Sequence, residues 1–183
     1  MGSPKTLLRL GGETFLDRAI SVYAQVCDTV TVVLGHQAET IRARSTRGGA
    51  VNFVVNSDPE RGQLSSLQAG LAAISEDPDA VSFCPVDCAA VRPETVRELI
   101  DALAGSRAAF AIPRYRGKRG HPVVFRTPVL AEFLSLPASA SARDIVHAYA
   151  TRTVYVDTED FGVALDADTP EDYEALVKAV EEG

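Results

Sequence analysis

This sequence of 183 residues is poor in cysteine. Its three cysteines, Cys27, Cys84 and Cys88, lack the paired CxxC spacing of zinc or thioredoxin-type sites. No secretory signal is recognisable, so we expect free thiols in a protein of the reducing cytoplasm. Cys84 and Cys88 flank Asp87 and are expected to be small buried cysteines at a strand end. The alternative is that they form a site for a soft metal.

Long hydrophobic runs and an excess of basic charge are missing as well. No apolar stretch approaches the ~20 residues that a membrane-spanning helix needs, so we expect no membrane association. The chain has 18 Lys and Arg residues against 25 Asp and Glu residues, which gives a formal net charge of −7 at pH 7. Nucleic acids and anionic membranes bind basic faces, so this charge argues against broad binding to either. A local site for one small anion is compatible with it.

Internal repeats and interdomain linkers are also absent from the sequence. The Ser/Ala/Pro-rich stretch at 135–142 is too short to separate two domains. Hydrophobic residues make up 46% of the chain and charged residues 23%, as in ordinary soluble globular proteins. The length suits one domain with a substantial core. We therefore predict a single domain over residues 1–183.

Helical and strand periodicities alternate along the chain. The apolar spacing predicts strands at 29–34, 51–55, 79–86, 108–112 and 122–125, and near Val154 and Val163. It predicts helices at 15–26, 37–44, 65–75, 93–103, 127–134, 141–149 and 170–180. The nearly uninterrupted apolar run at 79–86 is typical of a central strand covered on both faces. The alternation predicts an α/β fold with a mostly parallel sheet.

Two apolar runs end in aspartates. The segment Val81–Asp87 ends at Asp87, and the segment Val163–Asp168 carries Asp166 and Asp168. Side chains at the carboxyl ends of parallel strands face the crevice where ligands bind, and Mg²⁺ prefers one or two carboxylates together with substrate phosphates. We therefore expect Asp87 and one of the two later aspartates to form a metal site. The alternative for Asp87 is a turn cap, since an Asp often follows a strand in that role.

Basic residues concentrate at one place in this acidic chain, the loop that contains Arg114, Arg116, Lys118 and Arg119. Such a run is usually a solvated connection, but beside a carboxylate-held metal it would supply countercharge for a phosphorylated substrate. His121 follows, and a lone loop histidine is more often structural than catalytic. The chain also opens with a loop that contains Lys5 instead of a strand, which is unusual for an α/β protein.

Five segments in this order carry a resemblance to a known family: Met1–Lys5, Gly62–Ser66, Pro85–Asp87, Arg119–Phe125 and Asp166–Asp172. Together they resemble the molybdenum-cofactor cytidylyltransferases, within a superfamily that includes molybdenum-cofactor guanylyltransferases and sugar-nucleotide pyrophosphorylases. The similarity covers essentially the whole chain, and the Gly-His-Pro element at 120–122 points to the cytidylyl branch. The implied fold is a Rossmann-like three-layer α/β/α domain with a mostly parallel mixed sheet, of the nucleotide-diphospho-sugar transferase type.

The resemblance implies Mg²⁺-dependent transfer of CMP from CTP to the terminal phosphate of molybdopterin, with release of pyrophosphate; a molybdoenzyme would be the client. It assigns Lys5 and Asp87 to catalysis and Asp87 and Asp168 to the metal. The Gly62–Ser66 loop would face the nucleobase, and the basic loop with His121 would face the pterin. The implied substrate-binding residues are Gly2, Ser3, Lys5, Gly62, Gln63, Ser65, Ser66, Arg116, Arg119 and His121.

One departure from the family concerns the start of the chain. Family members open with a strand and a glycine-rich loop, Leu-Ala-Ala-Gly-x-x-x-x-Arg, directly before the Met-Gly pair at which this sequence begins. We therefore expect the first strand and its triphosphate loop to be missing from this chain. Either the natural protein is longer, or triphosphate binding has been lost. The alternative functions are nucleotidyl transfer from GTP or to a sugar phosphate, and non-catalytic binding and delivery of molybdopterin.

Overall fold

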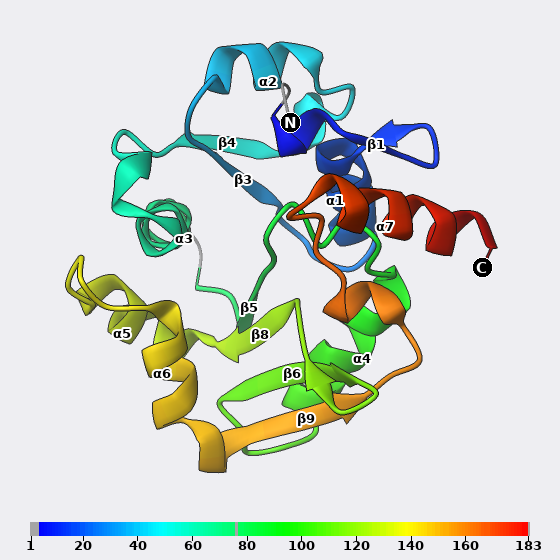
Figure 1. Ribbon diagram of the computed structural model, residues 1–183. Helices are drawn as coiled ribbons and strands as arrows, with labels where there is room; N and C mark the ends of the chain where they lie inside the picture. Colours follow the sequence, from blue (N-terminus) through cyan, green and yellow to red (C-terminus); the bar gives the residue numbers. More distant parts are fainter. Residues whose placement is uncertain (1–3, 76, 183) are drawn as a thin grey trace.

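The computed structural model describes residues 4–75 and 77–182, in which helices surround a set of sheet strands (Figure 1). The helices are α1 (Phe15–Tyr23), α2 (Ala38–Arg44), α3 (Gln63–Ala72), α4 (Pro93–Ala104), α5 (Leu130–Ser135), α6 (Ala142–Ala148) and α7 (Pro170–Glu182). Each overlaps a helix predicted from the apolar spacing. None of the helices in the described ranges is long and apolar enough to cross a membrane.

The main strands form one two-stranded and one five-stranded sheet. They are β3 (Thr31–Leu34), β4 (Asn52–Val55), β5 (Ala80–Phe83), β6 (Phe110–Tyr115), β7 (Lys118–Arg119), β8 (Val123–Arg126) and β9 (Thr153–Asp157). Strands β3 and β4 pair in parallel, and so do β6 and β9. Strand β8 lies between β5 and β6 and is antiparallel to both, so β5, β6 and β9 share one direction. The predicted α/β fold with a mixed, mostly parallel sheet is confirmed.

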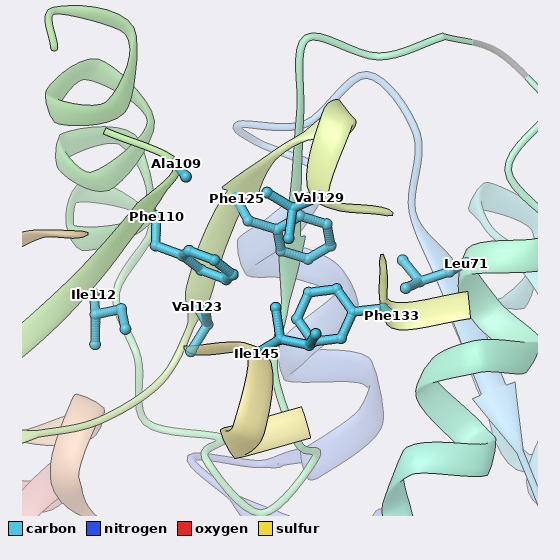
Figure 2. Packing of buried hydrophobic residues seen from close by; sticks show 9 residues of the cluster. All are labelled: Leu71, Ala109, Phe110, Ile112, Val123, Phe125, Val129, Phe133 and Ile145. Atoms are coloured by element: carbon cyan, nitrogen blue, oxygen red, sulfur yellow. The ribbon is translucent and has the colours of Figure 1, made fainter. Parts of the chain in front are cut away.

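The five-stranded sheet is covered on both faces. On one face Phe110 and Phe125 pack against Phe133 of α5 and Ile145 of α6, as Figure 2 shows. Their neighbours along β6 and β8 contact α4 on the other face, because successive side chains of a strand point to opposite sides. The domain therefore has the three layers that were predicted.

The smaller sheet is covered in the same way. Leu34 of β3 packs against Leu16 and Ile20 of α1 on one face. Helix α3 covers the other face at Gly70, where a Cβ atom would lie only 2.8 Å from Cγ2 of Val33. The absence of a side chain at Gly70 therefore lets α3 approach β3 closely.

The two sheets are not joined by hydrogen bonds. Among the described residues, β3 pairs with β4 alone and β5 with β8 alone. Every residue of β5 is only partly buried, whereas the apolar run at 79–86 predicted a central strand covered on both faces. The interruption between the two sheets lies between β3 and β5.

Two local predictions differ from the structure. The strand predicted near Val163 is wrong: Phe161–Ala164 form a 3₁₀ turn, η6, because the Asp160 carboxylate accepts a hydrogen bond from the Gly162 amide at 3.0 Å. A hairpin of β1 (Arg9–Leu10) and β2 (Glu13–Thr14) was not predicted. Its turn consists of Gly11 and Gly12, both with positive φ, which is a recognised signal for a two-residue hairpin.

Candidate functional site

Three of the predicted site residues meet at one point. Lys5 lies in the 3₁₀ turn η1 (Lys5–Leu7), Asp87 in the turn after β5, and Asp168 just before α7. The Lys5 Nζ atom is 2.5 Å from Oδ1 of Asp168 and 3.6 Å from Oδ2 of Asp87. The Asp87 side chain is 22% exposed and the Asp168 side chain 65% exposed. Segments that are remote in the sequence thus form a cluster, which we call the acidic site.

Local packing explains why these carboxylates point outward. Ala167 is fully buried against Leu10 and Leu176, so its neighbours Asp166 and Asp168 both face away from the core. Of these two, Asp168 is the one that contacts Lys5. Asp87 follows the carboxyl end of β5, where ligands bind in α/β sheets.

Electrostatics keep Lys5 positively charged. The hydrogen bond to Asp168 raises the pKa of Lys5; partial burial opposes this effect and the charge of Asp87 adds to it. The ammonium group therefore remains protonated at neutral pH. Two carboxylates against one ammonium leave the acidic site with negative charge that a further cation would offset.

The donor atoms suit a hard divalent cation. Two carboxylates that converge on one positive charge match the preference of Mg²⁺ for one or two carboxylates plus phosphate oxygens. Within residues 4–75 and 77–182, no three His, Cys, Asp or Glu side chains form a group that could hold a metal ion. A metal at the acidic site would therefore take its remaining ligands from substrate or water.

His121 lies near the acidic site and has an unsatisfied ring atom. Its backbone amide donates to the Val163 carbonyl at 2.9 Å, and its ring packs edge-on against Phe83. The Nδ1 atom is buried without a hydrogen-bond partner in the described part of the chain. Burial lowers the pKa of His121, and Arg143 lowers it further, although Asp87 and Asp166 oppose the shift. The imidazole is therefore neutral at pH 7 and can hydrogen-bond a ligand.

The basic loop lies on the hairpin of β6 and β7. Arg119 lies over the ring of Tyr155, 4.7 Å from its centroid, and Arg116 lies over Tyr115 at 5.1 Å. Arg114 forms a two-pronged ion pair with Asp157 at 2.8 and 2.9 Å. The contacts described for these arginines are with Tyr115, Tyr155 and Asp157 and not with the acidic site, so a role for Arg116 and Arg119 in substrate binding stays a prediction.

The predicted nucleobase loop is held by a residue that was not predicted. Asn56, buried after β4, donates through Nδ2 to Ser65 Oγ at 2.8 Å and to Ser66 Oγ at 3.0 Å. Gly62 has a φ of 87°, and Gln63, the first residue of α3, is exposed. Gln63 is thus available to a ligand, whereas Ser65 is occupied within the fold. Gly2 and Ser3 lie outside the described residues.

The cysteines are free thiols. Cys84 is partly buried and Cys88 is buried. A hydrogen bond with Cys84 and burial raise the pKa of Cys88 far above its usual range, so this thiol stays protonated. The soft-metal alternative at these two cysteines finds no support, since the described residues contain no cluster of three metal-binding side chains.

Comparisons with known proteins identify the family and the fold. A family model described as MobA-like NTP transferase domain matches residues 1–154. A protein of Synechococcus elongatus, described as a probable molybdenum cofactor guanylyltransferase, is 30% identical over 96% of this chain and 91% of its own. The crystal structure of Rv0371c from Mycobacterium tuberculosis has a TM-score of 0.83 at 30% identity, covering 97% of this chain and 90% of that one. A manganese complex of Rv0371c has a TM-score of 0.80 at 28% identity, covering 96% and 92%.

Proposed function

Because the chain belongs to the MobA-like NTP transferase family, we propose that it transfers CMP from CTP to the terminal phosphate of a molybdopterin-type cofactor. Nucleotidyl transfer is the chemistry of the family, and the proposal concerns the substrates, the metal and the residues that act. The observation that carries it is the contact of Lys5 with both Asp87 and Asp168. This cluster offers carboxylates to a metal and an ammonium group to phosphates at one place.

The proposed reaction asks for charge stabilisation more than for covalent participation by the protein. An acceptor phosphate oxygen attacks the α-phosphorus of the triphosphate, and the bond to the β-phosphate oxygen breaks, so that the electron pair leaves with pyrophosphate. Asp87 and Asp168 would hold Mg²⁺, which would neutralise charge on the phosphate oxygens. The Lys5 ammonium would contact the same phosphates and offset charge on the leaving pyrophosphate.

Two observations bear on the nucleobase, and each favours a different nucleotide. The Gly-His-Pro element at 120–122 favours CTP. A second candidate is GTP, because the Synechococcus relatives are described as probable molybdenum cofactor guanylyltransferases. We propose that the base binds at the Gly62–Ser66 loop, where Gln63 is exposed and Asn56 holds the hydroxyl groups of Ser65 and Ser66.

The acceptor is proposed to bind beside His121. A pterin ring carries hydrogen-bond donors and acceptors, which suit the neutral imidazole and its unpartnered Nδ1 atom. Arg116 and Arg119 would supply countercharge to phosphate from the β6–β7 hairpin. The product would pass to a molybdoenzyme in the cytoplasm, the compartment in which three free cysteines are expected.

Pyrophosphate release tests this proposal. CTP and GTP are supplied separately with molybdopterin and Mg²⁺ to the wild type, to Asp87→Ala and to Asp101→Ala, an exposed control on α4. The assay is run on this chain and on one preceded by the glycine-rich strand that the resemblance implies. We expect release with CTP that falls by orders of magnitude in Asp87→Ala alone, because that variant loses charge stabilisation in the transition state.

Other outcomes of this assay would contradict the proposal in distinct ways. Equal rates for the wild type and Asp87→Ala would exclude the role given to Asp87. Pyrophosphate release with GTP but not with CTP would show that the protein transfers GMP and not CMP. Molybdopterin binding without pyrophosphate release from either nucleotide, in both forms of the chain, would favour a delivery protein.

A further inference from the structure

Asp160 is a fully buried aspartate whose carboxylate hydrogen-bonds both the start of α4 and the turn η6. Its exposed fraction is 0%. It accepts hydrogen bonds from the backbone amide of Arg92 at 2.9 Å, from Oγ1 of Thr95 at 2.7 Å and from the backbone amide of Gly162 at 3.0 Å. A buried charge is tolerated only with such partners. Asp160 has no part in the chemistry proposed above.

The Asp160 carboxylate contacts two different segments. Oδ2 accepts from Arg92 and Thr95, at the start of α4 directly after the turn that carries Asp87. Oδ1 accepts from Gly162 in η6, the turn that leads into Asp168, and also lies 3.5 Å from Nε of Arg92 in an ion pair. One side chain thus ties the segment with the first metal-binding aspartate to the segment with the second.

Close backbone packing supports the same connection. A Cβ atom at Gly162 would overlap the backbone carbonyl of Ala90, and a Cβ atom at Gly120 would overlap the carbonyl oxygen of Val163. Figure 1 shows η6, in orange before α7, beside the green segment that precedes α4. The turn η6 therefore packs closely, backbone against backbone, on the segment after Asp87 and on the residue before His121.

We infer that Asp160 is a positioning residue that sets the separation of Asp87 and Asp168 through η6. Asp160 acts on the reaction only through these two carboxylates. The inference rests on the proposed function, because the separation matters only if both aspartates hold one metal ion. Reactive groups must be held within about 0.5 Å of their working geometry, and a tie between the two segments achieves this.

Mn²⁺ binding to the full chain without nucleotide, measured by titration calorimetry or electron paramagnetic resonance, tests the inference. The test variant is Asp160→Asn, in which an amide NH₂ replaces one of the accepting oxygens. The matched control is Asp17→Asn on α1, which is also buried, at 2% exposure, but accepts from Ser45 and Thr46, which do not belong to the acidic site. We expect about tenfold weaker Mn²⁺ binding in Asp160→Asn, as for other residues that orient metal ligands.

The control should lower the unfolding temperature without changing the Mn²⁺ affinity. If Asp160→Asn does not fold, Thr95→Val removes one donor to Asp160 at nearly constant volume and should weaken Mn²⁺ binding in the same direction. Unchanged affinity in the folded Asp160 or Thr95 variant would overturn the inference, and so would equal weakening in Asp17→Asn. If Asp87→Asn binds Mn²⁺ as tightly as the wild type does, the proposed function is refuted, and the inference with it.

Discussion

Aspartates serve two different purposes in this chain, and the difference is set by what surrounds each carboxylate. Asp17 and Asp160 are buried and accept hydrogen bonds from backbone amides and hydroxyl groups. Asp87 and Asp168 are partly exposed and share the ammonium group of Lys5. The oxygens of the first pair are satisfied by the fold, whereas those of the second pair are exposed enough to contact a ligand.

Asp17 gives a prediction of pH dependence. Burial raises the pKa of Asp17, but hydrogen bonds from Ser45 and Thr46 outweigh burial and hold the pKa below its usual 3.8. The stabilisation is therefore present above pH 3.8 and is lost as the pH falls through the lower pKa of the folded state. We expect Asp17→Asn to reduce the free energy of unfolding at pH 7 by about 1 to 3 kcal/mol.

Urea denaturation of the wild type and of Asp17→Asn at pH 7 and near pH 3 measures this effect. The difference between the two proteins should shrink at the lower pH, because the carboxyl group of the unfolded wild type binds a proton below its usual pKa of 3.8 and part of the stabilisation is lost. A difference that stays constant across this range would show that the charge of Asp17 contributes nothing.

One face of the five-stranded sheet is covered in part by a short helix, α5, that is held by aromatic packing. Helix α5 has only six residues and would not be stable alone, so its position comes from Phe133. This side chain has an exposed fraction of 0% and packs against Phe125, with ring centroids 4.9 Å apart, and against Phe110 at 6.2 Å (Figure 2). The aromatic cluster thus fixes α5 to the five-stranded sheet.

Neighbouring residues on α5 allow a matched test of this packing. Phe133→Ala should cost about 3 to 5 kcal/mol of folding stability, because it removes a buried aromatic ring and leaves a cavity. Leu134→Ala, at a site that is 39% exposed, should cost much less. Urea denaturation measures both variants, and similar losses would contradict the packing described for α5.

At the scale of the whole molecule, the sequence predicted the order and type of the main elements, because apolar spacing reports directly on buried faces. It failed at η6, where Val163 to Leu165 resemble part of a strand but Asp160 turns the chain into a 3₁₀ helix. Asp87 and Asp168, which the structure brings together at Lys5, drew attention in the sequence because they follow apolar runs; their role as metal ligands stays a prediction. Asn56 and Asp160 were missed, because their roles depend on partners that are distant in the sequence and become visible only in the fold.

The open edges of β3 and β5 set a second limit on what the sequence shows. Periodicity identified both strands but carries no information about which strand pairs with which. In the described structure each has one hydrogen-bonded neighbour. The acidic site nevertheless forms, because Lys5, Asp87 and Asp168 are joined by side-chain contacts and not through the sheet.

The affinity for Mn²⁺ of the wild type, of Asp87→Asn, of Asp168→Asn and of the double variant tests the shared metal site most directly. Two carboxylates that bind the same ion are energetically coupled, so each single change should remove most of the tight binding and the double variant should lose little more. Affinities that are unchanged in the single variants, or losses that simply add in the double variant, would contradict a metal held jointly by Asp87 and Asp168.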